Sequence, residues 1–207
     1  MDIWKKNFPE QFKPTLTKIC KEYSDIFGLE TETISTNNFC ERKLRLNDKQ
    51  PVYIKNYSIP HSHKNEINKQ VRKLIDNKII EPSFSEYNSP ILLVPKRSLP
   101  GSNEKRWQLV IDYRQINKKL LSDKFPLPRI DDILYQLGKA KYFSCLDLMS
   151  GFHQIGLEKD SRDLTSFSTS NGSYRLTRLP YGLKIAPKND DNCFQWSEGR
   201  SGISIYG

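Results

Sequence analysis

The sequence predicts an α+β fold, because segments with helical periodicity lie between pairs of apolar runs that have the length and composition of strands. Two such pairs are joined by turn-forming residues and are predicted β-hairpins: 90–96 with 106–113, and 165–169 with 174–179. The chain has 207 residues, of which 36% are hydrophobic, so it can bury a real core and is not a disordered tail.

Residues 1–50 are predicted to form an upstream connector with one helix. Apolar side chains recur at helical spacing from Phe12 to Phe27, and the polar stretch 31–38 then breaks the pattern. The next predicted helix has one apolar face and ends before Pro82; the residues of that face are Ile67, Val71, Leu74 and Ile75.

The pair His61 and His63 precedes this helix, and we expect a solvated loop there rather than a metal site. The first hairpin has Pro100 and Gly101 between its strands. A short helix is predicted over 130–137, with Gly138 as its C-cap.

Residues 142–148 and 153–158 are predicted strands. Asn171 and Gly172 form the turn of the second hairpin, since this dipeptide readily adopts the positive φ angles of a tight turn.

Charge and cysteine content narrow the classes of function. Lys and Arg number 33 against 24 Asp and Glu, which gives a net charge of +9 and raises nucleic acid as a partner. The four cysteines form no C-x-x-C pair, as in a reduced intracellular protein without a zinc module. No apolar run is long enough to span a membrane and no signal peptide is recognisable, so we expect an intracellular location.

Asp147 is the candidate catalytic residue. It ends an apolar β-type run and precedes a turn of small residues, a place where its carboxylate and the Leu148 carbonyl could both bind a divalent cation. On this segment alone, a carboxylate that caps the turn is the more common alternative.

The order of the segments around Asp147 says more about function than the Asp147 segment does alone. SPILLVPK, RWQLVIDYRQIN, FPLPRIDDIL, YFSCLDLMSGFHQI, TSFST and LPYGLKIAP follow one another between residues 89 and 187. This series closely resembles the reverse transcriptase of gypsy-class LTR retrotransposons, over roughly residues 50–187, and several collinear motifs are more specific than one. The resemblance implies the fingers and part of the palm of a right-hand polymerase, without the thumb, most of the palm and the remainder of a Pol polyprotein.

The resemblance also implies site residues, substrates and a cofactor. Asp147 and the Leu148 carbonyl would bind Mg²⁺ in a two-metal site, where a primer 3′-hydroxyl attacks the α-phosphate of a dNTP opposite an RNA or DNA template. Lys96 would contact the triphosphate, and Phe152 would lie under the sugar. For these two, a solvated lysine and a core aromatic remain open as alternatives.

Four more residues match motifs of the family. Tyr181 and Gly182 would line the nucleotide pocket, and the alternative is a turn that needs a glycine. Asp112 and Arg114 would support the template strand, and the alternative is an exposed salt bridge.

The chain departs from the family at Gln108, where members usually have an arginine that contacts the triphosphate. A neutral amide cannot supply this charge-assisted contact, so nucleotide binding is in question. We expect that Arg106 does not replace it, on the premise that the two side chains face opposite sides of the strand.

A second departure concerns the Tyr-x-Asp-Asp hairpin, which carries another palm aspartate in the family and is not found in these residues. Asp131 and Asp132 are better explained as solvated acids at a helix start, and Asp190 and Asp191 as loop acids. Segment 188–207 resembles nothing in the family. In a permissive back-translation, a one-base shift restores a Tyr-Met-Asp-Asp block at its end, so we interpret 188–207 as a frameshifted tail.

Three functions follow as hypotheses. The first is a segment of an RNA-directed DNA polymerase that is inactive as written, because a metal-binding aspartate is missing. The second is a non-catalytic, basic nucleic-acid-binding module, and the third is a structural remnant that neither binds nor catalyses.

Overall fold

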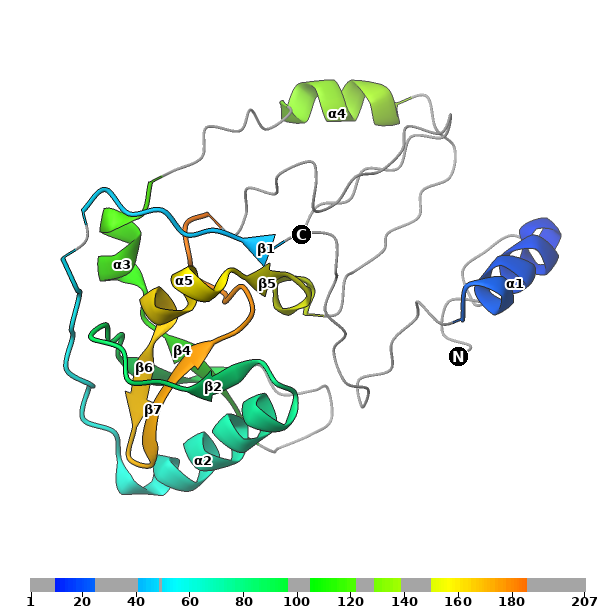
Figure 1. Cartoon of the computed structure of the whole chain (residues 1–207). Helices are drawn as coiled ribbons and strands as arrows, with labels where there is room; N and C mark the ends of the chain where they lie inside the picture. Colours follow the sequence, from blue (N-terminus) through cyan, green and yellow to red (C-terminus); the bar gives the residue numbers. More distant parts are fainter. Residues whose placement is uncertain are drawn as a thin grey trace. The chain divides into compact units, whose positions relative to one another are not determined.

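A computed structural model describes residues 10–24, 41–48, 50–96, 105–121, 129–138 and 150–185 (Figure 1). The chain divides into two compact units, Met1–Thr33 and Ile34–Gly207. In the first unit, a 3₁₀ turn η2 (Glu10–Phe12) leads into helix α1 (Lys13–Glu22), with a proline in its first turn. The helix predicted in this part of the connector is confirmed.

Helix α2 (His61–Asp76) buries Ile67 and Val71, as its apolar spacing predicts. It begins at His61, directly after Pro60, so the expectation of a loop at His61 and His63 is wrong. A proline just before the first turn loses no hydrogen bond there, because the first backbone N–H groups of a helix have no partner within the helix.

Strands β3 (Ile91–Lys96) and β4 (Arg106–Ile111) form the predicted antiparallel hairpin, with Ile91 opposite Ile111 and Lys96 opposite Arg106. Helix α3 (Arg114–Lys119) follows β4 after a short turn. Between these elements Tyr113 is buried, and its hydroxyl donates a 3.0 Å hydrogen bond to the Thr165 carbonyl.

A three-stranded antiparallel sheet has the order β2-β7-β6, from β2 (Ile80–Pro82), β7 (Gly172–Leu176) and β6 (Phe167–Thr169) (Figure 1). The predicted turn at Asn171 and Gly172 is confirmed, and Gly172 has a φ of 143°. An isolated bridge between Ser89 and Phe167 links the start of β3 to this sheet.

The strand predicted over 153–158 is wrong for its first half. Ser150 has a left-handed φ of 51°, and a 3₁₀ turn η4 (Gly151–Gln154) follows it. Within 153–158 the strand is limited to β5 (Gly156–Leu157), which pairs in parallel with β1 (Glu41–Arg42). The predicted strand 142–148 lies outside the described residues.

The remaining elements are α4 (Ile130–Leu137), α5 (Lys159–Arg162) and η5 (Asp163–Thr165), of which α4 confirms the predicted helix that ends at Gly138. The core of the second unit joins α2, both hairpins and the segment after β7. Its most deeply buried side chains are those of Ile91, Tyr113, Ile116, Leu157, Phe167, Leu179 and Leu183. Among the helices that the structure describes, none is long and apolar enough to cross a membrane.

Candidate nucleotide and nucleic-acid interface

The β3–β4 hairpin carries on one face three polar residues that the sequence analysis discussed for contact with the triphosphate. Lys96 lies directly opposite Arg106, and both side chains are exposed. Gln108 lies opposite Val94 two residues further along β4, and it is exposed too, whereas Trp107 between them is half-buried. We call Lys96, Arg106 and Gln108 the hairpin face.

The position of Arg106 corrects the sequence analysis. Arg106 and Gln108 are separated by one residue rather than adjacent, so the alternation of a strand places them on the same side. The hairpin face therefore carries two cations, Lys96 and Arg106, beside the neutral Gln108.

Trp107 and its neighbours fix the orientation of this face. The side chain of Gln70, on α2, donates to the Trp107 carbonyl over 3.0 Å and accepts from the Leu109 amide over 2.8 Å. The Trp107 ring packs against His63 with a centroid separation of 4.5 Å. Because Trp107 is held toward α2, the side chains on either side of it point the other way.

A second group of predicted residues lies at the end of β4. Arg114 binds the Asp112 carboxylate through Nε and Nη2 at 2.7–3.0 Å, and the Tyr57 hydroxyl donates to Asp112 over 2.9 Å. We call Tyr57, Asp112 and Arg114 the surface arginine cluster. The salt bridge expected from the residues alone is present, and Tyr57 is a member that the sequence analysis missed.

The cluster leaves its cation available to a ligand. The Asp112 side chain is only 9% exposed, whereas that of Arg114 is 77% exposed. The hydrogen bonds from Arg114 lower the pKa of Asp112 to about 2, so this carboxylate is ionised at neutral pH. Arg114 is thus held in one orientation at the surface.

Phe152 and Tyr181 meet in a third group. Their rings make an edge-to-face contact with centroids 5.1 Å apart, and Tyr181 is 46% exposed. Phe152 is half-buried against the core, so the alternative role of a core aromatic describes its packing. Gly182 has a φ of 90°, which confirms a turn that needs a glycine.

Helix α3 ties this turn to the surface arginine cluster. The Asn117 side chain donates to the Gly182 carbonyl over 2.7 Å and accepts from the Lys184 amide over 2.9 Å. Arg114 begins the same helix. One short helix therefore carries Arg114, a proposed template residue, and supports the turn at Gly182, a proposed nucleotide residue.

His153 supports the ring of Tyr181 from within, with ring centroids 5.0 Å apart. Burial, together with the nearby positive charge of Arg178, lowers the pKa of His153 to about 4. The Arg178 guanidinium also donates to the His153 carbonyl over 3.1 Å. At neutral pH the imidazole is uncharged, which allows it to pack against an aromatic ring.

The predicted metal ligands Asp147 and Leu148 lie outside the described residues, as do Asp190 and Asp191. Within the part of the chain that the structure describes, no group of three or more His, Cys, Asp or Glu side chains could hold an ion. Asp131 and Asp132 are exposed in the first turn of α4, the helix-start position expected for them.

Comparison with known proteins decides the family. Residues 94–193 match the family described as reverse transcriptase (RNA-dependent DNA polymerase). The retrovirus-related Pol polyprotein from transposon 412 of Drosophila melanogaster is 71% identical over 185 residues, which are 89% of this chain and 15% of that protein. The chain belongs to the reverse transcriptases of retrotransposon Pol polyproteins.

Other relatives agree with this family. The Pol polyprotein from transposon gypsy of the same species is 38% identical over 86% of the chain and 17% of its own length. This reverse transcriptase segment therefore spans less than a fifth of the length of these two curated relatives.

Solved structures confirm the predicted fold, a mixed fingers and palm segment. A crystal structure of prototype foamy virus protease-reverse transcriptase matches with a TM-score of 0.74 and 26% identity, over 87% of this chain and 24% of that one. A foamy viral protease-reverse transcriptase in complex with double-stranded DNA matches with a TM-score of 0.68 and 25% identity, over 87% of this chain and 31% of that one.

Proposed function

We propose that this reverse transcriptase segment binds a primer–template and a dNTP for RNA-directed DNA synthesis. One observation carries the proposal: α3 joins the surface arginine cluster to the Gly182 turn, so proposed template and nucleotide contacts share one support. The foamy viral enzyme bound to double-stranded DNA has the same fold at 25% identity, which supports a nucleic-acid partner.

The hairpin face is the proposed contact for the triphosphate. Gln108 lacks the charge of the usual arginine, but Arg106 lies on the same side of β4 and directly across from Lys96. Two cations on one face can neutralise phosphate oxygens as the resemblance requires. We therefore assign to Arg106 the contact that Gln108 cannot make.

The surface arginine cluster and the Phe152–Tyr181 pair have separate proposed roles. The exposed guanidinium of Arg114 would bind a template phosphate, while Asp112 and Tyr57 hold it in place. Tyr181 and Phe152 would form the floor beneath the sugar and base, supported by the neutral ring of His153.

Asp147 and the Leu148 carbonyl are the proposed ligands for Mg²⁺. Carboxylate and carbonyl oxygens suit this hard cation, and when bound it would stabilise the attacking and leaving oxygens of phosphoryl transfer. The 207 residues contain no Tyr-x-Asp-Asp motif, so we expect them to bind substrates without extending a primer.

The test measures how much of a labelled primer–template with a template overhang is retained by the protein. It is done with Mg²⁺ and either the complementary or a non-complementary dNTP. The proposal expects tighter retention with the complementary dNTP only, and expects Asp147→Asn to abolish this difference. A non-catalytic binding module instead predicts retention that neither the dNTP nor Asp147→Asn changes. A structural remnant predicts no retention at all, and primer extension by these residues would refute their inactivity.

Arg106→Gln and Gln108→Arg separate the two strand positions. If Arg106 contacts the triphosphate, Arg106→Gln removes the effect of the complementary dNTP, and adding Gln108→Arg restores it. An Arg106→Gln variant that responds to the dNTP as the wild type does would exclude Arg106 from the site.

A further inference from the structure

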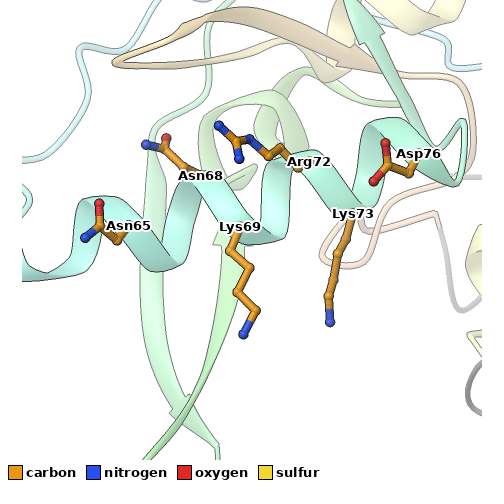
Figure 2. A pocket seen from close by; sticks show the side chains of 6 residues that line it. All are labelled: Asn65, Asn68, Lys69, Arg72, Lys73 and Asp76. Carbon is orange, nitrogen blue, oxygen red and sulfur yellow. The ribbon is translucent and has the colours of Figure 1, made fainter.

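Helix α2 has a basic side that none of the proposed contacts uses. A hollow of about 390 Å³ along this helix is lined by six polar residues, shown in Figure 2: Asn65, Asn68, Lys69, Arg72, Lys73 and Asp76. We call this surface the α2 basic face. Lys69 and Lys73 extend on one side of the helix, and Asn68 and Arg72 on the other (Figure 2).

The three cations of this face are exposed. Among the described residues, no carboxylate lies within ion-pair distance of Lys69, Arg72 or Lys73. Glu66, one turn before Lys69, instead accepts a hydrogen bond from Gln70, on the side where the helix meets β4.

The spacing of these cations destabilises the helix. Arg72 and Lys73 lie three and four residues after Lys69, so the three like charges are neighbours on the helix surface and repel one another. Asp76, in the same hollow, is a single carboxylate against these three cations. A solvated charged face more often alternates its signs. A bound anion that shares the space between the three would turn this repulsion into attraction.

The face is held in place by its surroundings. Gln70 fixes the helix to β4 through Trp107 and Leu109, and the Asn171 amide in the β6–β7 turn donates to Asn68 over 3.0 Å. The side of α2 that carries Ile67 and Val71 packs against the sheet strands, so only the basic side is open to a ligand. A flexible single strand can follow such a surface.

We propose that the α2 basic face binds the phosphate backbone of single-stranded nucleic acid. The cations neutralise phosphates, and the amides of Asn65 and Asn68 lie in the same hollow as hydrogen-bonding groups. From Asn65 to Asp76 the helix is roughly 16 Å long, room for a few phosphates of an extended strand. The inference rests on the proposed function, because the strand held here is an unpaired template.

The experiment measures binding of the whole chain to labelled oligo(dT) and to a blunt DNA duplex by fluorescence anisotropy, over a range of salt. The variant is Lys69→Gln with Lys73→Gln. We expect roughly tenfold weaker binding to oligo(dT) at 0.1 M salt, and a slope of log K against log[salt] that is smaller by about 1.4, since each single-strand phosphate contributes about 0.7. Duplex binding should change less than twofold.

The matched control is Lys55→Gln with Lys159→Gln, which removes the same charge from two exposed positions outside α2. It should leave the oligo(dT) affinity and slope within twofold of wild type. The α2 variant removes like-charge repulsion, so its melting temperature should not fall. If that variant nevertheless fails to fold, Arg72→Gln alone should reduce the slope by about 0.7.

Equal losses for the α2 variant and the control, or equal losses on duplex and single strand, would overturn the proposal. Retention on phosphatidylserine vesicles that depends on Lys69 and Lys73, with oligo(dT) binding intact, would overturn it in favour of a membrane surface. If wild type binds neither nucleic acid, the proposed function fails as well. If it binds duplex normally and the α2 variant binds oligo(dT) as wild type does, only this inference fails.

Discussion

Two arginine–carboxylate clusters in the same unit have similar distances and opposite surroundings. In the surface arginine cluster, Arg114 directs Nε and Nη2 at the single carboxylate of Asp112 and stays 77% exposed. In the sheet, Arg175 divides its donors between Glu81 and Asp163, each at 2.8 Å, and is 31% exposed. The first arrangement leaves a cation at the surface, and the second uses the cation to join elements.

The difference distinguishes a binding role from a stabilising one. Glu81 and Arg175 are direct cross-strand partners in β2 and β7, and Asp163 belongs to η5, so Arg175 holds three elements together. Arg114 and Asp112 are two residues apart, so their contact adds little to the tertiary structure. Hydrogen-bond distances alone would not separate the clusters, whereas the number of carboxylates bound, the exposure of the arginine and the sequence separation do.

Arg175→Gln should have the largest effect on stability. It removes the shared partner of Glu81 and Asp163, both half-buried, although Arg162 stays 3.5 Å from Glu81. We expect a loss of about 2 kcal/mol in unfolding free energy after allowing for solvent screening. Urea unfolding followed by circular dichroism measures this. A loss no larger than that of Arg114→Gln would show that the two clusters do not differ in this way.

Arg114→Gln should have the converse effect, on binding rather than on folding. Removing one phosphate contact lowers the slope of log K against log[salt] for a DNA duplex by about 0.9. Affinity should fall severalfold at 0.1 M salt, as fluorescence anisotropy would show. Arg175→Gln, measured well below its melting temperature, is the control and should bind as wild type does; a weaker affinity there would contradict the assigned roles.

The elements predicted from sequence are those that local signals define. The face of α2, the two apolar runs of the first hairpin and the Asn171–Gly172 turn all follow from residues close together in the chain. Strand β2 was not predicted, because three residues carry no periodicity and its pairing depends on β7. The strand predicted from 153 was half wrong because the left-handed Ser150 begins a 3₁₀ turn that no local rule indicates.

The candidate site was predictable only through family resemblance, and its supporting residues were not predictable at all. Lys96, Asp112, Arg114 and Tyr181 match family motifs, but Tyr57 is 55 residues from its partner Asp112, and Asn117 is 65 residues from Gly182. Such contacts exist only after folding has closed long loops. Arg106 shows a different limit: strand alternation alone could have placed it beside Gln108, since the two are separated by one residue.

The smallest expected effect concerns stability at low pH. Acid should remove the small contribution that the Asp112–Arg114 contact makes to the free energy of unfolding. Arg114 lowers the pKa of Asp112 to about 2 in the folded chain, against about 3.9 for an unfolded aspartate. The unfolded state then takes up a proton first as the pH falls. The contribution is therefore complete above about pH 5 and is lost progressively between that pH and pH 2.

Urea unfolding of wild type and Arg114→Gln at several pH values would reveal this loss. The difference in unfolding free energy between the two chains should be constant from pH 7 to pH 5 and should shrink toward zero as the pH approaches 2, because protonated Asp112 no longer attracts the guanidinium. A difference that stays the same at pH 3 and pH 7 would mean that Arg114 stabilises the fold through packing rather than charge. The distinction between the two clusters would then rest on binding alone.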